Sequence, residues 1–281
     1  PPMMRILVLG CGYVGLPLAQ ELARLGHEVH AARRSIFSAE GITTHQVDVT
    51  QRDSFGSLPH EFDWVFLTAS SSRGDAMMHR AVFTDGTHNL LNWLGNSHAR
   101  VLFTSSTSVY PQTNGNWVDE KSPEKPSTGT AKHLAQAEEM LIESDHSCTI
   151  LRVSGIYGPE RGHLYRQLLR GEAVICEAGK RWMNMIHRED VIGAILAAIE
   201  AESGIYNATD NEPVTEGAFF EWLTNRLGKS MPPENESLIR KRAVTNKRVR
   251  NTKLKTTGWV LRFPTFREGY EALIREEQGG R

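Results

Sequence analysis

Short, continuously apolar runs alternate with amphipathic helical stretches through the first two-thirds of the chain. The helical stretches carry apolar residues at three- and four-residue spacing, which is the period of an α-helix. Apolar runs without polar alternation are typical of parallel strands that are buried on both faces. The runs lie at residues 5–10, 27–32, 45–49, 64–69, 100–106 and 148–154, and the helical stretches at 16–25, 75–94 and 131–143. This alternation predicts an α/β fold of the Rossmann type, with a doubly wound parallel sheet.

The regularity weakens after residue 154. Loop signals rich in proline and glycine are followed by a predicted helix over 188–201, a strand over 204–209 and helices over 215–227 and 264–275. We expect residues 1–154 to form the core that carries the sheet. Residues 155–281 are expected to form mainly a smaller, substrate-binding lobe, with some segments that return to the core.

Composition and charge indicate which classes of binding partner and which cellular compartment to expect. The chain has 32 Lys and Arg against 33 Asp and Glu, a formal net charge of −1, which does not suggest a nucleic-acid partner. Three cysteines, an odd number at wide spacing, fit reduced thiols better than a disulfide framework. No apolar run approaches the length of a membrane span. We therefore expect a cytoplasmic protein with no membrane partner.

A glycine-rich turn follows the first apolar run, in the sequence ILVLGCGYVG. In a strand–turn–helix unit, such glycines allow a tight turn, close approach of the backbone to a pyrophosphate, and close contact between helix and strand. The amino terminus of the following helix then offers N–H groups and a positive dipole end to the phosphates. The turn therefore predicts a dinucleotide site that involves Gly10, Gly12, Tyr13, Val14 and Gly15.

The end of the second predicted strand favours NADP over NAD. An acidic residue in this region would bind the ribose 2′-hydroxyl of NAD. The sequence has Arg33 and Arg34 instead. Two guanidinium groups match a 2′-phosphate by charge and by their forked geometry. The alternative, that one or both arginines only face solvent, remains open at this stage, so NAD stays possible.

Six further segments follow the glycine turn in order. They read VDV at 47–49, TAS at 68–70, DGTHNLL at 85–91, FTSSTSVYP at 103–111, LRVSGIYGP at 151–159 and MNMIHREDV at 183–191. Together with the turn they resemble the extended short-chain dehydrogenase/reductases, the nucleotide-sugar epimerase and dehydratase family, and especially its atypical members. The resemblance covers nearly the whole chain. It implies additional cofactor contacts by Asp48, Val49, Thr68, Ala69, Ser70, Thr104, Lys132 and Val153.

The resemblance also implies catalytic roles. Ser106 would hold the reacting oxygen and Lys132 would hold the nicotinamide ribose. In the family a tyrosine four residues before the lysine moves the proton, and that spacing puts both side chains on one helix face. This chain has Thr128 at that position, and a threonine hydroxyl ionises far less readily than a phenol. Gly155 replaces the family's asparagine that supports the sugar-nucleotide diphosphate, so a nucleotide-sugar substrate is not implied.

Three residues are candidates to replace the missing tyrosine as the acid. In order of preference they are Tyr157, His187 and Tyr110, which all lie in segments expected near the substrate. The ordinary pKa of histidine suits proton transfer near neutral pH. For each candidate, the alternative is a purely structural role. The family has loop tyrosines that take no part in acid–base catalysis, and a lone histidine usually only forms hydrogen bonds.

A basic segment lies between residues 237 and 262, with nine Lys or Arg and no Asp or Glu. It is either a solvated surface or a pocket for a phosphate or carboxylate. Its aromatic residues begin only at Trp259, which argues against nucleic-acid binding. For substrate contact we single out Arg248, besides Ser106, Tyr110 and His187. The histidines and cysteines show no metal-ligand spacing, so no metal is expected.

These observations support two hypotheses. The first is an NADP- or NAD-dependent oxidoreductase, or an epimerase/dehydratase-like enzyme, that acts on a small hydroxylated metabolite such as a sugar or a phosphorylated compound. The second is a cofactor-binding redox sensor or assembly protein without turnover, which Thr128 favours. The helices near 75–94 and 131–143 correspond to the family's dimer helices, so a homodimer is expected.

Overall fold

The computed structural model describes residues 2–69, 76–126, 129–237 and 245–279. The chain divides into two compact units. Unit 1 contains residues 1–109, 124–152 and 198–206, and unit 2 contains residues 110–123, 153–197 and 207–281. The chain therefore passes between the units several times. Three elements contribute residues to both units: β7 (Cys148–Val153), β11 (Ile205–Ala208) and α6 (Arg188–Ile199).

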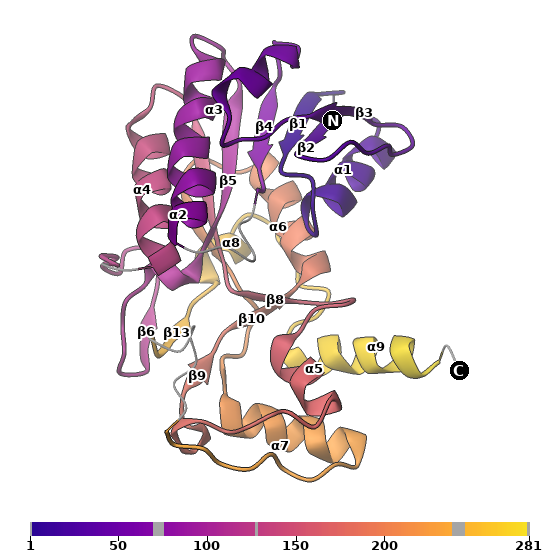
Figure 1. Ribbon diagram of the computed structural model, residues 1–281, viewed down its shortest axis with the longest axis vertical. Helices are drawn as coiled ribbons and strands as arrows, with labels where there is room; N and C mark the ends of the chain where they lie inside the picture. Colours follow the sequence, from indigo (N-terminus) through magenta and orange to yellow (C-terminus); the bar gives the residue numbers. More distant parts are fainter. Residues whose placement is uncertain (1, 70–75, 127–128, 238–244, 280–281) are drawn as a thin grey trace. The chain divides into compact units, whose positions relative to one another are not determined.

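Unit 1 is built on a seven-stranded parallel sheet in the order β11–β7–β5–β4–β1–β2–β3 (Figure 1). Because strand order reverses at β1, the sheet is doubly wound, which confirms the predicted fold class. Its strands are β1 (Arg5–Leu9), β2 (Glu28–Arg33), β3 (Thr43–Gln46), β4 (Trp64–Leu67), β5 (Arg100–Ser106), β7 (Cys148–Val153) and β11 (Ile205–Ala208). The inner strands β1 and β4 are almost wholly buried, as continuous apolar runs require.

The helices of unit 1 flank this sheet, with α1 on one side and α2, α3 and α4 on the other (Figure 1). They are α1 (Gly15–Arg24), η1 (Arg52–Ser57), α2 (Ala76–His79), η2 (Arg80–Asp85), α3 (Gly86–Leu94), η3 (Thr107–Val109) and α4 (Gly129–Glu143). The predicted helix over 75–94 is thus three successive segments, of which η2 is a π-helix. A π-helix has wider turns than an α-helix, and apolar residues at three- and four-residue spacing do not distinguish the two. The sequence pattern therefore did not reveal the π-helix.

Unit 2 contains three small strand pairs and five helices among its described residues. The pairs are β6 (Asn116–Val118) with β13 (Lys247–Val249), β8 (Gly155–Tyr157) with β10 (Met185–His187), and β9 (Trp182–Met183) with β12 (Val214–Thr215). The helices are α5 (His163–Leu169), α6 (Arg188–Ile199), α7 (Glu216–Leu227), α8 (Thr252–Lys255) and α9 (Phe266–Gln278), with a short turn η4 (Glu177–Gly179). No helix in the described part of either unit combines the length and apolarity needed to cross a membrane.

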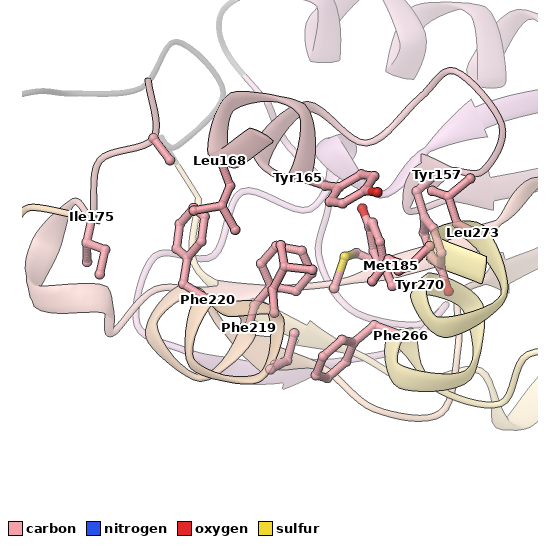
Figure 2. Close-up of a cluster of buried hydrophobic side chains, with 14 residues drawn as sticks. Tyr157, Tyr165, Leu168, Ile175, Met185, Phe219, Phe220, Phe266, Tyr270 and Leu273 are labelled. Carbon is pink, nitrogen blue, oxygen red and sulfur yellow. The ribbon is translucent and has the colours of Figure 1, made fainter. Parts of the chain in front are cut away.

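An aromatic cluster forms the core of unit 2 (Figure 2). We use this name for Tyr157, Tyr165, Phe219, Phe220, Phe266 and Tyr270, which are all at most 2% exposed. The Tyr157 and Tyr270 rings stack with centroids 4.3 Å apart and planes inclined by 6°. A capping box at Thr265 and Glu268 fixes the start of α9, the helix that carries Phe266 and Tyr270. The cluster therefore joins β8, α5, α7 and α9 into one core.

Candidate cofactor site and active site

Two of the three glycines in the predicted turn are required by the packing of the chain itself. Gly10 has φ +79°, and a Cβ added there would overlap the backbone of Ala69. A Cβ at Gly15 would lie 2.7 Å from the Thr68 hydroxyl, which donates hydrogen bonds to the carbonyls of Leu9 and Gly10. Ala69 and Thr68 at the end of β4 thus shape the turn, whatever contact they make with a nucleotide.

Gly12 differs, because nothing in the described chain requires a glycine there. It is exposed and is not among the glycines with positive φ, and the nearest heavy atom to an added Cβ is the Gly10 carbonyl oxygen at 4.0 Å. Helix α1 begins nearby without a side-chain cap at Val14. A turn that leaves open space beside a helix start without a side-chain cap fits a dinucleotide pyrophosphate. Tyr13 and Val14 are half-buried within the same turn.

Arg33 lies beside this turn at the end of β2. Its guanidinium lies 4.2 Å from the centre of the Phe37 ring, and its Nε is buried with no hydrogen-bond partner among the described residues. Burial raises the pKa of the Cys11 thiol to about 11, and the nearby Arg33 charge opposes that rise. Arg34 is exposed, and its carbonyl accepts a hydrogen bond from Gln46. An unpartnered guanidinium donor next to the turn fits a phosphate-bearing ligand.

The other expected cofactor residues lie at strand ends. The Asp48 carboxylate accepts hydrogen bonds from the backbone N–H and the hydroxyl of Thr50, at 3.0 and 2.7 Å. Val49 is 7% exposed and packs against Gly86 on α3. Thr104 donates to the Leu67 carbonyl at 3.3 Å. Val153 is buried at the end of β7, whereas Ser70 lies outside the described residues. These contacts to a nucleotide stay predictions.

Ser106 and Lys132 lie on neighbouring elements of unit 1. Ser106 ends β5 and is half-buried, and its Oγ accepts a hydrogen bond from the Ser108 N–H at 3.1 Å. Lys132 is exposed in the first turn of α4 and lines a groove of about 430 Å³ together with Arg80 and Thr84 of η2. Thr128 lies outside the described residues. The structure therefore places the predicted lysine in a groove between two helices.

Tyr157, the preferred replacement acid, is a core residue of the aromatic cluster (Figure 2). Its side chain is 1% exposed, and its hydroxyl has no hydrogen-bond partner among the described residues. A Cβ at Gly269 on α9 would overlap that hydroxyl, so a glycine is needed opposite it. Burial, and then the charge of Asp210, raise the pKa of Tyr157 far above its ordinary value. Both effects oppose proton transfer by this phenol.

His187 is also held in a structural role. Its Nδ1 accepts a hydrogen bond from the Glu189 N–H at 3.1 Å, at the start of α6. The ring packs on Tyr157 and Phe263, at centroid distances of 5.3 and 4.3 Å. Burial, with help from the charges of Arg188 and Arg262, lowers the pKa of His187 to about 4. A neutral imidazole at neutral pH can cap the helix, but its poor basicity does not favour acid catalysis.

Tyr110 is wholly buried in unit 2. Its hydroxyl donates a hydrogen bond to the Asn207 side chain at 2.7 Å, and its carbonyl accepts one from the Lys247 ammonium at 3.0 Å. Burial lowers the pKa of that lysine to about 8. All three candidate acids are therefore enclosed within unit 2 by packing or hydrogen bonds, which the motif positions alone did not indicate.

Arg248 lies among tryptophans that are distant in the sequence. Its Nε donates to the Gly115 carbonyl at 2.9 Å, and its guanidinium lies 4.8 Å from the Trp182 ring and 5.1 Å from the Trp117 ring. The pairing of β13 with β6 places Trp117 directly opposite Arg248. These aromatic neighbours of Arg248 leave no local signal in the sequence, because only the pairing of distant strands brings them to the basic segment.

A second cavity, of about 190 Å³, adjoins this strand pair in unit 2. Trp117 and Arg250 line it, with the guanidinium 4.5 Å from the indole ring. Lys255 adds a second cation and Asp210 a buried carboxyl group. A cavity with two cations and one aromatic face can bind a small anionic compound. No group of three or more potential metal ligands occurs among the residues that the structure describes.

Comparisons with known proteins agree with this architecture. The family described as "NAD dependent epimerase/dehydratase family" matches residues 6–209. A solved structure from Methylobacillus flagellatus, described as an NAD-dependent epimerase/dehydratase, is 32% identical, covers 99% of this chain and 100% of its own, and superposes with a TM-score of 0.83.

Two curated relatives also match along most of their length. Protein YeeZ of Escherichia coli is 29% identical over 254 residues, which are 84% of this chain and 88% of YeeZ. A 3-diazoavenalumate denitrifying reductase of Streptomyces is 25% identical over 310 residues, with 95% of this chain and 99% of the reductase covered. The resemblance seen in the sequence motifs is confirmed, and the chain belongs to the NAD-dependent epimerase/dehydratase family.

Proposed function

We propose that this protein is an NADP(H)-dependent oxidoreductase that transfers hydride between the cofactor and a small polar metabolite. The observation that carries the proposal is the open glycine turn at Gly12, beside the unpartnered guanidinium donor of Arg33. The packing of the chain accounts for Gly10 and Gly15 but leaves Gly12 free for a ligand. Membership of a nicotinamide-dependent family supports the same reading.

The arginine pair supports NADP over NAD. Arg33 is held on the Phe37 ring and keeps an unused buried donor, while Arg34 follows it at the exposed edge. A 2′-phosphate would satisfy both groups through charge-assisted hydrogen bonds. The 2′-hydroxyl of NAD would leave two cations without an anion.

The chain's own residues would bind and orient the reactants. The nicotinamide cofactor supplies or accepts the hydride. The Gly12 backbone and the first turn of α1 would hold the pyrophosphate, and the Ser106 hydroxyl would hold a polar atom of the substrate by a hydrogen bond. The enclosed positions of Tyr157, His187 and Tyr110 do not favour any of them as proton donor. We therefore assign Ser106 to the reacting end and assign proton donation to none of these three residues.

The substrate need not be a nucleotide sugar. Gly155 stands where the family has the asparagine that supports a sugar-nucleotide diphosphate, and one relative is named a reductase of a diazo compound. A small hydroxylated metabolite other than a nucleotide sugar fits these observations.

A calorimetric titration tests the cofactor proposal. Nucleotide-free protein is titrated with NADPH and with NADH, and the same titrations are repeated on Arg33→Gln and Arg34→Gln. We expect NADPH to bind at least about tenfold more tightly than NADH, and each substitution to reduce that preference. Arg52→Gln, an exposed arginine of unit 1, is the control and should keep it. Equal binding of the two nucleotides, or binding insensitive to both substitutions, contradicts the proposal.

A second candidate function is NADP(H) binding without turnover, as in a redox sensor. The enclosure of all three candidate acids favours it. The two functions differ in a single-turnover experiment, in which the absorbance of bound NADPH is followed during incubation with a panel of carbonyl and imine compounds. Oxidation of the bound cofactor supports the enzyme. Unchanged absorbance with every compound, together with tight NADPH binding, supports the sensor.

A further inference from the structure

A buried ionic network fixes the rotation of α4 against the sheet. Glu138 on α4 is 2% exposed and accepts a hydrogen bond from the Ser105 hydroxyl at 2.5 Å. Its carboxylate also accepts from the guanidinium of Arg152 on β7, at 2.6 Å, and that guanidinium is paired with Glu124 as well. Ser105 immediately precedes Ser106 on β5. The face of α4 that carries Glu138 is therefore the face directed at the end of β5.

Helix geometry shows which other residues share that face. Each residue advances about 100° around an α-helix, so Leu134 lies within about 40° of Glu138, and Thr130 within about 80°. Leu134 is 4% exposed, in agreement with this placement. Side chains on a helix also lean toward its amino terminus, which brings these two residues toward the beginning of the helix.

Lys132 lies on a different face of α4. It is six residues before Glu138, a rotation of about 120°. Its own face continues with Gln136, Glu139 and Glu143, and all of these residues line the same groove with Arg80 and Thr84. The lysine therefore faces α2–η2 and solvent, whereas Glu138 and Leu134 face the sheet.

We propose that α4 presents Thr130 and Leu134, and not Lys132, to the reacting end of the site at Ser106. The two residues are four apart, as in the tyrosine–lysine pair that the family resemblance had placed at positions 128 and 132. This inference rests on the proposed NADP(H) site. It assigns Thr130 as a hydroxyl that contacts the ligand, assigns Leu134 as an apolar wall, and removes Lys132 from cofactor binding.

The assignment also indicates a class of hydride acceptor. Reduction of a ketone produces an alkoxide that requires a proton, which a phenol with a neighbouring ammonium group can supply. Thr130 and Leu134 supply neither group. An iminium ion needs no proton: the hydride of NADPH forms the new C–H bond, the C=N electron pair moves to nitrogen, and the products are a neutral amine and NADP⁺. We therefore infer that the site beside Thr130 and Leu134 reduces hydride acceptors that are already cationic, of the iminium class.

Calorimetry with NADPH tests the α4 assignment. Lys132→Met is compared with the wild type and with Gln136→Met, which alters the same groove without changing charge. We expect both variants to bind NADPH within about twofold of the wild type. A loss of tenfold or more in Lys132→Met alone would show that the lysine holds the cofactor and would overturn the assignment. If the wild type binds no NADPH, the proposed function fails, a result visible without any variant.

The acceptor class is tested with two probes of equal ring size, the cyclic iminium ion N-methyl-1-pyrrolinium and the ketone cyclopentanone. Consumption of NADPH is measured with the wild type, Lys132→Met and Thr130→Val. We expect kcat/KM at least tenfold higher for the iminium probe, unchanged in Lys132→Met and reduced in Thr130→Val. Faster reduction of the ketone, with loss of that reaction in Lys132→Met, would overturn both parts of the proposal. A protein that binds NADPH but does not reduce the iminium probe would overturn the acceptor class.

Discussion

The glycine turn of unit 1 and Tyr157 in the aromatic cluster of unit 2 both lie in segments that match motifs of the same family, yet they differ in how far the surrounding chain explains the motif residues. In the turn, packing accounts for Gly10 and Gly15 and leaves open space at Gly12. In the cluster, the stacked Tyr270 ring and Gly269, which makes room for the hydroxyl, enclose Tyr157. A motif residue that no neighbour in the chain requires therefore supports a ligand-binding role. A motif residue that its neighbours enclose supports a structural role.

The largest expected effect is that of Gly10→Ala, which tests the structural half of the turn. The substitution combines a positive φ with overlap between the new methyl group and the backbone of Ala69. Because backbone cannot move aside as a flexible side chain can, we expect a loss of about 5 kcal/mol in the free energy of unfolding, measured by urea denaturation. Gly26→Ala, also at positive φ but without a neighbour within 4 Å, is the control and should lose only about 1 kcal/mol.

Asp210 tests whether buried polar groups near the cluster cost stability. It is 2% exposed, one carboxylate oxygen has no hydrogen-bond partner among the described residues, and burial raises its pKa from 3.8 to about 8. The folded state therefore binds an extra proton between these values, and wild-type stability should fall as pH rises through that window.

Asp210→Asn removes this dependence. Its advantage over the wild type should grow from pH 4 to pH 8 and reach up to about 4 kcal/mol at pH 7. His187, whose folded-state pKa is about 4, adds the opposite slope to both proteins, so the difference between them isolates Asp210. A difference that does not change with pH would show that this carboxyl group is solvated in the folded protein.

Gly269→Ala tests the enclosure of Tyr157. The new methyl group would overlap the Tyr157 hydroxyl and the adjoining ring atoms, in a core that cannot expand cheaply. We expect a loss of about 3 kcal/mol in the free energy of unfolding. The same substitution in a Tyr157→Phe background should cost less, because the nearest atom is gone. Equal costs in the two backgrounds would mean that the hydroxyl does not lie against α9.

Tyr157→Phe should have the smallest effect. The hydroxyl has no partner among the described residues, so its removal should change the free energy of unfolding by no more than about 1 kcal/mol, and in the stabilising direction. NADPH oxidation, where measurable, should be retained. A hundredfold loss of turnover with unchanged NADPH affinity would show that Tyr157 is the acid. It would contradict the structural role that distinguishes Tyr157 from Gly12.

The fold and the cofactor turn were predictable because their signals are local. Continuous apolar runs indicated β1, β4 and β5, and the glycine spacing indicated the turn between β1 and α1. The run at 45–49 was less reliable: β3 is an edge strand that ends at Gln46, and Val47 and Val49 are buried beyond its end. Apolar residues just after a strand cannot be distinguished from residues within it by periodicity alone.

The rest of the site depends on contacts between distant parts of the chain. Tyr157 is covered by Gly269 and Tyr270, more than a hundred residues later, and Trp117 reaches Arg248 only through strand pairing. The four-residue spacing between position 128 and Lys132 predicts only that two residues of one helix would share a face. It does not say which face meets the sheet, which the contact between Ser105 and Glu138 determines.

The most direct test of the account is Gly12→Ala, examined for both stability and binding. Because Gly12 has no positive φ and its added Cβ meets only one atom at 4.0 Å, the free energy of unfolding should stay within about 1 kcal/mol of the wild type. The methyl group would occupy the space assigned to the pyrophosphate, so NADPH affinity measured by calorimetry should fall at least tenfold. Unchanged affinity, or a large loss of stability, would contradict the claim that the chain keeps this glycine for a ligand.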